Sequence, residues 1–139
     1  MPFSASKRVS ERGSDRRVAV WAEALYLINL LPAPLIGFLA LVWLYTAHRK
    51  EASPLAACHL RQTVFVSIWA GVLIGAVALA IVWIGGFAQP ATWVVLILYV
   101  TCIHSAFILF GVIGLTKAMA AQPYRYPLIG PRCETEETE

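Results

Sequence analysis

The two longest apolar stretches of this chain contain no charged residue. Residues 63–87 and 92–116 have no Lys, Arg, Asp or Glu, and charged residues make up only 14% of the whole sequence. Hydrophobic residues make up 59% of the 139 positions, more than a soluble domain of this size can cover. About 20 apolar residues suffice for a helix to cross a bilayer. Both stretches therefore predict transmembrane helices, within a chain short enough for one domain.

Motifs that carry chemistry are also missing. The sequence has no phosphate-binding loop, no HExxH motif and no spacing typical of a nucleophile, base and acid. Its three histidines are dispersed, and dispersed histidines do not predict a metal site. We therefore expect no enzyme, no catalytic residue, no bound metal and no cofactor.

Cysteine is scarce as well, with Cys58, Cys102 and Cys133 as the complete set. Their spacing matches no metal or redox motif. Cys102 lies in an apolar stretch, where we expect a small buried thiol. The other two lie in segments that we place on the cytosolic side, where thiols usually stay reduced.

Charge is concentrated at the two ends. Residues 1–17 carry five Lys and Arg among serines and glycine, which predicts a mostly disordered arm that meets anionic lipid. Residues 130–139 carry four Glu and predict a disordered acidic tail. Nothing besides the basic head favours nucleic-acid binding, so we do not expect it. We also expect no cleaved signal peptide, because Glu23 and two prolines interrupt the following apolar region.

Two prolines divide the apolar region that follows the basic arm. Pro32 and Pro34 disfavour one continuous helix over residues 18–47, because proline removes a backbone donor and restricts the residue before it. We therefore predict a hairpin with helices at 18–31 and 35–48. The connector at 49–62 predicts a short helix that begins near Pro54.

The positive charges support this hairpin. If residues 18–47 crossed the membrane once, five of the eleven Lys and Arg would lie on one side and six on the other. If they enter and return, all eleven lie on one side, as expected of cytoplasmic loops. We therefore predict a multi-pass protein of the bacterial inner (cytoplasmic) membrane with both termini in the cytoplasm. The prolines leave open whether the hairpin crosses the bilayer or re-enters.

The predicted fold is all-α. It is a polytopic helical membrane protein with two long transmembrane helices and a proline-broken N-terminal hydrophobic hairpin. The helical membrane domain spans residues 18–129.

A polar patch lies in the last apolar stretch. His104 stands near its middle, with Thr101 and Ser105 close by. An ionisable group at this depth is a functional hypothesis by default. The alternative is a neutral imidazole that forms a hydrogen bond between helices and gives their packing specificity. A weaker hypothesis is haem ligation, which would need a second histidine.

Polar residues near the cytosolic surface leave further alternatives. Glu23 fits a headgroup position near the basic arm, which we favour, or a buried acid paired with Arg61 or His59. His59, Arg61 and Gln62 open the first long apolar helix. They predict interfacial anchors, which we favour, or ligands of lipid phosphate.

Small residues at four-residue spacing form a second pattern. Ser67, Gly71 and Gly75 place a small-residue groove on one helix face, where another backbone can approach closely. Packing within the chain and contact with a second copy or a membrane-protein partner both remain open.

Three segments together resemble a known family. These are residues 34–50, the run His59-Leu60-Arg61-Gln62, and the motif Tyr124-Arg125-Tyr126-Pro127-Leu128. Their order is similar to that of the DUF4870 family of small bacterial membrane proteins, related to the Tic20-like family. The resemblance implies a compact helical membrane domain. Within the last motif, Arg125 suits a phosphate or a partner carboxylate, or it serves as an interfacial anchor.

These observations favour a non-enzymatic structural or accessory subunit of a membrane complex. The alternative is a transport or channel component in which His104 lines a polar path. A haem or redox subunit is the weaker alternative.

Overall fold

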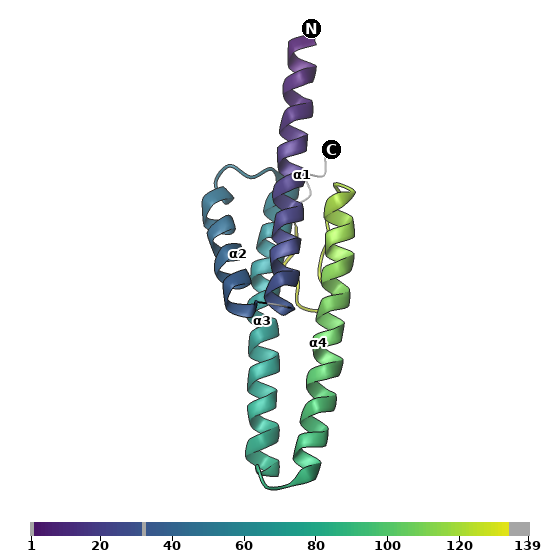
Figure 1. Cartoon of the computed structure of the whole chain (residues 1–139). Coiled ribbons are helices and arrows are strands. Elements are labelled where there is room, and N and C mark those ends of the chain that lie inside the picture. Colours follow the sequence, from purple (N-terminus) through teal and green to yellow (C-terminus); the bar gives the residue numbers. More distant parts are fainter. Residues whose placement is uncertain (1, 32, 134–139) are drawn as a thin grey trace.

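A computed structural model describes residues 2–31 and 33–133, which form four α-helices (Figure 1). The helices are α1 (Pro2–Leu30), α2 (Pro34–His48), α3 (Pro54–Gly85) and α4 (Pro90–Met119). The predicted all-helical class is confirmed, and α3 and α4 are long and apolar enough to cross a membrane.

Helix boundaries follow local sequence signals. Ser53 caps α3 by accepting a hydrogen bond from the backbone N–H of Ala56, and Pro54 occupies the first turn, where no intrahelical donor is needed. Gly86 ends α3 with φ 75°, a backbone conformation that residues with a Cβ rarely adopt. Pro90 then opens α4. The predicted short connector helix at Pro54 is therefore the first part of α3, because nothing between 54 and 85 interrupts the backbone hydrogen bonds.

α1 is longer than the sequence predicted. The basic segment at 2–17, expected to be a disordered arm, continues the helix that runs to Leu30 and protrudes beyond the other helices (Figure 1). Extending an existing helix adds one hydrogen bond per residue fixed, whereas starting one is costly. Opposite charges at helical spacing, such as Arg12 and Asp15, also favour it. Of the disordered tail predicted at 130–139, residues 134–139 lie outside the described residues, whereas Pro131 and Cys133 are bonded to α3.

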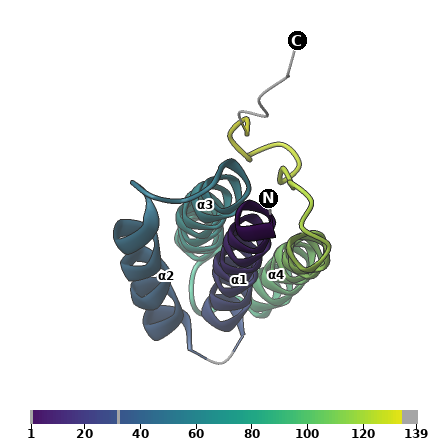
Figure 2. The ribbon, with the colours of Figure 1, turned by 90° about the horizontal axis from the view of Figure 1, so that it is seen from above.

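Like α3, α1 contacts each of the other three helices (Figure 2). Its buried side chains recur at helical spacing, which produces one continuous inward stripe. They are Ala19, Ala22, Glu23, Tyr26 and Leu30.

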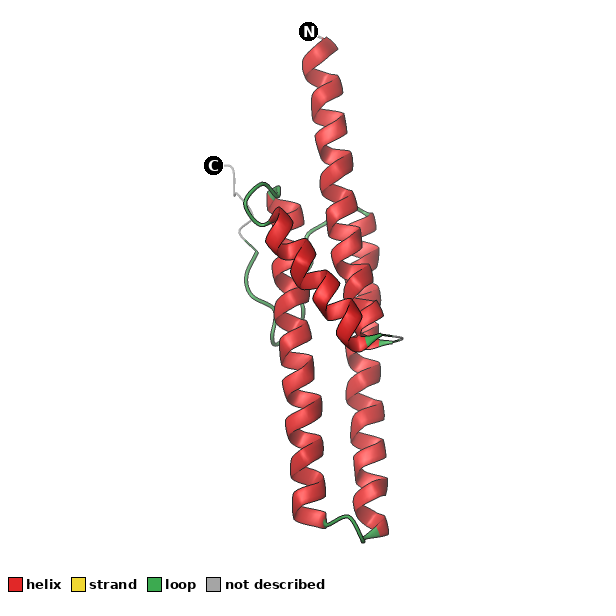
Figure 3. Ribbon diagram, turned by 60° about the vertical axis from the view of Figure 1, so that its left-hand side comes forward, coloured by secondary structure: helices red, strands yellow, loops and turns green. Residues whose placement is uncertain are grey.

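The α1–α2 hairpin reaches only part of the way along the long helices. Figure 3 shows its turn beside the middle of α3 and α4. Close packing of the two arms depends on Gly37, because a Cβ there would lie 2.5 Å from the backbone nitrogen of Asn29. The predicted hairpin is thus present, with α1 ending at Leu30 and α2 beginning at Pro34. It does not extend along α3 and α4 as far as the Gly85–Pro90 link (Figure 3).

Below the hairpin turn, α3 and α4 expose apolar side chains. Trp83 and Ile84 of α3 are each 85% exposed, and Phe87 in the link to α4 is 73% exposed. Only 17% of the most apolar window of α3 and 11% of that of α4 is buried within the chain. An apolar surface of this extent is stable in lipid rather than in water. The long helices therefore belong in a membrane.

Candidate functional site

Residues 120–133, which we call the C-terminal segment, fold back from the end of α4 onto α3. Tyr126 is 1% exposed and joins a buried cluster with Tyr26, Val66 and Phe107. The segment then reverses at Leu128, which is fully exposed at φ 69°. Pro123, Pro127 and Pro131 prevent a long helix in this segment, yet its backbone is held against the bundle.

Beneath this segment lies a group of buried polar side chains, the polar clasp, made of Glu23, His59, Gln62 and Tyr126. None is more than 1% exposed. They come from α1, α3 and the C-terminal segment, so the clasp joins three parts of the chain. Burial of polar groups is tolerated only when their hydrogen bonds are satisfied.

The centre of the clasp is the pair Glu23 and His59. Glu23 Oε1 lies 2.6 Å from His59 Nδ1, and His59 Nε2 lies 2.9 Å from the carbonyl oxygen of Gln122. The Gln122 carbonyl can only accept, so Nε2–H donates to it, and Nδ1 forms the hydrogen bond with the Glu23 carboxyl. Our preferred placement of Glu23 in the headgroup region was wrong. The alternative pairing with His59 is what the structure shows.

Tyr126 completes the hydrogen bonding of Glu23. Its hydroxyl donates to Glu23 Oε2 at 2.6 Å. Burial raises the pKa of Glu23, which lies on α1 outside the two spanning helices, while hydrogen bonds from His59 and Tyr126 act in the opposite direction. Burial also raises the pKa of Tyr126, and the neighbouring Glu23 carboxyl adds to this effect. The tyrosine therefore stays a neutral donor at physiological pH.

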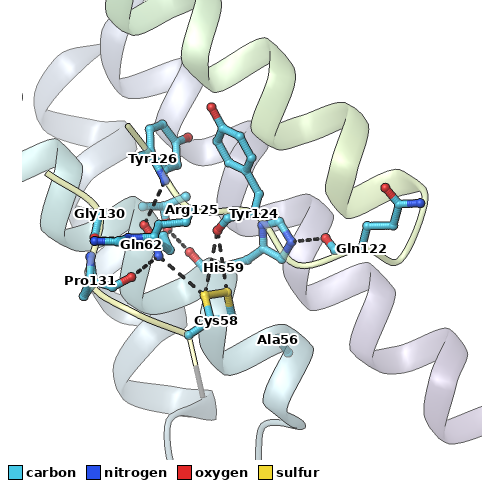
Figure 4. Close-up of a disulfide and its surroundings, with 12 residues drawn as sticks. Ala56, Cys58, His59, Gln62, Gln122, Tyr124, Arg125, Tyr126, Gly130 and Pro131 are labelled. Carbon is cyan, nitrogen blue, oxygen red and sulfur yellow. Dashed lines mark hydrogen bonds between the residues drawn. A yellow bond between two sulfur atoms is a disulfide. The ribbon is translucent and has the colours of Figure 1, made fainter. Parts of the chain in front are cut away.

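Gln62 fastens the segment on both sides of its reversal (Figure 4). Its Oε1 accepts a hydrogen bond of 3.3 Å from the backbone N–H of Tyr126, and its Nε2 donates to the carbonyl of Pro131. Only glycine fits at position 130, beside Gln62. An added Cβ there would collide with Gln62 Oε1 and would lie 2.6 Å from the carbonyl oxygen of Tyr126. A single amide side chain thus satisfies two backbone groups that no regular secondary structure would pair.

A disulfide joins Cys58 of α3 to Cys133 at the end of the C-terminal segment (Figure 4). Their Cα atoms are 5.2 Å apart, within the usual range for this bond. The prediction that both thiols are reduced was wrong for this structure, because their juxtaposition depends on a fold that brings together residues 75 positions apart. Cys102, expected to be buried, is exposed on the outer surface of α4.

The structure separates the remaining polar residues that the sequence singled out near this surface. Arg61 is exposed, whereas His59 and Gln62 are buried, so these two do not anchor α3 at the lipid surface. Arg125 is exposed, and its Nε donates to the carbonyl of Gly130 at 2.9 Å. Tyr124 is half-buried and packs edge-on against Tyr126 with ring centroids 5.0 Å apart.

The predicted polar patch on α4 does not form one site. His104 is half-buried and lines a cavity of about 710 Å³ between the hairpin turn and α3. Thr101 and Ser105 are exposed elsewhere on the helix and do not line it. Haem ligation by His59 and His104 is disfavoured, because both ring nitrogens of His59 are engaged in the clasp.

The small-residue groove on α3 borders the same cavity. Ser67 is buried, and a Cβ added at Gly71 or Gly75 would meet no atom within 4 Å. Close helix packing within the chain occurs instead at Gly111 and Gly114 of α4, where an added Cβ would meet Tyr26 and Glu23. These two glycines were not predicted as packing residues, although their three-residue spacing is visible in the sequence.

The exposed apolar helices and the buried clasp define a small all-helical membrane protein whose C-terminal segment is fastened to its transmembrane helices. Within this class, residues 14–132 match the magnetosome magnetite crystal formation protein family, MamF/MmsF. The chain belongs to this family. No curated protein and no solved structure matches it.

The match corrects the resemblance drawn from the sequence. The chain is not identified as a DUF4870 or Tic20-like protein. That resemblance was based on residues 34–50, His59–Gln62 and Tyr124–Leu128. The structure shows that His59, Gln62 and Tyr126 hold the C-terminal segment in place. Short motifs with a structural role of this kind do not discriminate between families of helical membrane proteins.

Proposed function

We propose that this chain is a non-enzymatic component of the magnetosome membrane that contributes to magnetite crystal formation as a structural or accessory subunit. Membership of the MamF/MmsF family over residues 14–132 is the observation that carries the proposal. The apolar exposure of α3 and α4 supports a membrane position.

The arrangement of the polar groups supports a structural role. Glu23, His59, Gln62 and Tyr126 spend their hydrogen-bonding capacity on one another and on backbone groups of the C-terminal segment. A catalytic group, by contrast, needs a free atom facing its substrate. In the described part of the chain, no group of three or more His, Cys, Asp or Glu side chains could hold a metal ion.

The charge pattern supports a topology in which both ends of the chain and the α2–α3 connector share the cytosolic side. All eleven Lys and Arg lie outside the apolar stretches, and the Gly85–Pro90 link carries none. On this topology the basic part of α1 meets anionic lipid, and the hairpin enters the bilayer from the cytosolic side and returns. The open face at Gly71 and Gly75 supports contact with a second copy or another membrane protein.

Gene deletion in the native host tests the proposed function. We expect the size or number of magnetite crystals, measured by electron microscopy, to change on deletion and to recover when the wild-type gene is returned. Immunoblots should find the protein in isolated magnetosomes. Unchanged crystals, or a protein absent from magnetosomes, would refute the proposal.

A clasp variant separates a structural role from an enzymatic one. His59→Leu removes both hydrogen bonds of the ring. If the role is structural, the crystal defect should scale with the loss of protein from the membrane. A crystal defect at full protein abundance would point to chemistry at the clasp instead.

A transport component is the second candidate, favoured by the position of His104 beside the 710 Å³ cavity, which the polar residues Asn29 and Ser67 also line. Thr101, part of the polar patch expected from the sequence, does not line this cavity. If the role is structural, His104→Ala should leave crystal formation unchanged, and a loss would favour transport.

A further inference from the structure

A second cavity, separate from the clasp, opens at the surface where α3 begins. Its volume is about 310 Å³. The walls come from the α2–α3 connector, the first two turns of α3 and the last described residues of the C-terminal segment. The lining residues with charged side chains are Arg61 and Arg132.

These two arginines are far apart in the sequence but are held together by two links. Gln62, next to Arg61, donates a hydrogen bond to the carbonyl of Pro131, next to Arg132. One turn earlier on α3, Cys58 is bonded to Cys133, on the other side of Arg132. Figure 4 shows both links between the helix and the segment. The positions of the arginine backbones are therefore fixed by the fold rather than by chance proximity.

Neither guanidinium has a counter-charge among the described residues. Among residues 2–31 and 33–133, no Asp or Glu lines the cavity, and neither Arg61 nor Arg132 forms an ion pair with a carboxylate of these residues. The exposed Glu51 precedes the lining residue Ala52 but does not itself line the cavity. The first turn of α3, beginning at Pro54, also borders the cavity and adds the positive end of a helix dipole. An anion in the cavity would be attracted by these positive groups.

We propose that this cavity is a binding site for a phosphate group, with Arg61 and Arg132 as its ligands. Guanidinium groups present planar, paired N–H donors that match the oxygens of phosphate. The phosphate is supplied either by the headgroup of an anionic lipid or by inorganic phosphate. This site lies beyond the proposed function and does not depend on it.

Calorimetry on the purified, oxidised full-length protein in detergent at low salt tests the site. Inorganic phosphate is titrated in one arm. In a second arm, native mass spectrometry measures retention of phosphatidylglycerol against phosphatidylcholine. Arg61→Gln and Arg132→Gln should each weaken binding by roughly tenfold or more, the scale of one lost charge-assisted hydrogen bond. Both side chains are exposed, so the variants should fold, which circular dichroism checks.

Arg49→Gln is the matched control, because Arg49 is an exposed arginine of the same connector that does not line the cavity. Binding in this variant should remain unchanged. Saturable binding of inorganic phosphate identifies the free ion as a ligand, and selective retention of phosphatidylglycerol alone identifies a headgroup. The proposal is overturned if neither probe binds, or if all three variants weaken binding equally, since that would reflect net charge only.

Discussion

His59 shows how one residue can be misjudged from sequence. Its place at the start of a long apolar helix, beside an arginine, is typical of an interfacial anchor. In the structure it is fully buried. Its burial is tolerated because Glu23 and the carbonyl of Gln122 satisfy both ring nitrogens. A buried pair of this kind is kept only where each partner is satisfied, since an unpaired member would be costly.

Tyr126 is the residue whose removal tests the clasp most directly. Tyr126→Phe keeps the ring, its edge-on contact with Tyr26 and its volume, but removes the O–H that donates to Glu23 Oε2. A buried acceptor left without its donor costs about 1–3 kcal/mol. We expect the free energy of unfolding, measured in detergent, to fall by about this amount.

Tyr124→Phe is the control for this change. The Tyr124 hydroxyl donates no hydrogen bond to any described residue, and its ring packs edge-on against Tyr126. Its stability should stay within about 0.5 kcal/mol of wild type, as is usual for substitutions that remove no buried interaction. Equal losses in the two variants would show that the Glu23 contact contributes nothing specific.

The helices themselves were more predictable than the residues between them. Proline and glycine signals at Pro34, Pro54, Gly86 and Pro90 mark boundaries that depend on local backbone geometry, and local geometry is written in the local sequence. The clasp was not predictable in this way. Its four members are up to 103 residues apart, and no local pattern specifies which distant groups will meet.

The glycines of the long helices illustrate the same limit at the scale of an element. The Gly71 and Gly75 spacing was recognised as a packing groove, yet that face is open. Gly111 and Gly114 allow α4 to pack closely against α1, although they are three residues apart rather than four. Which small-residue face is used depends on the partner helix, and this information lies in α1 rather than in α3 or α4.

Alanine substitution distinguishes the two faces. A Cβ at Gly111 would lie 2.7 Å from the ring of Tyr26, which is fully buried and hydrogen-bonded to the carbonyl of Phe107. Such overpacking costs about 1–3 kcal/mol, so Gly111→Ala should lower the thermal unfolding midpoint in detergent. Gly71→Ala fills open space and raises helix propensity, and its midpoint should be unchanged or higher. A stable Gly111→Ala variant would contradict the α1–α4 packing.

At the scale of the whole molecule, the C-terminal segment links the end of α4 to the rest of the bundle. It connects α4, where the chain leaves the membrane, to the start of α3 through Gln62 and the Cys58–Cys133 bond. In the chain-entropy account, a disulfide that closes a loop of 75 residues stabilises the folded state by about 4 kcal/mol. The bond and the charge pattern nevertheless point to different compartments, because the arginines favour the cytosol and the cytosol reduces disulfides.

This conflict leads to a prediction about when the bond exists. If the charge pattern sets the topology, Cys58 and Cys133 are thiols in growing cells, and the bond forms when the protein is purified in air. The thiols remain adjacent meanwhile, because Gln62 holds Pro131 independently of sulfur.

Acid quenching of cells followed by alkylation and mass spectrometry should find both cysteines alkylated. After air oxidation the same protein should resist alkylation at Cys58 and Cys133, while Cys102, exposed on α4, serves as the thiol that never pairs. A bond already closed in quenched cells would place this face in an oxidising compartment. The topology inferred from the eleven basic residues would then be inverted, and the phosphate site between Arg61 and Arg132 would face that compartment rather than the cytosol.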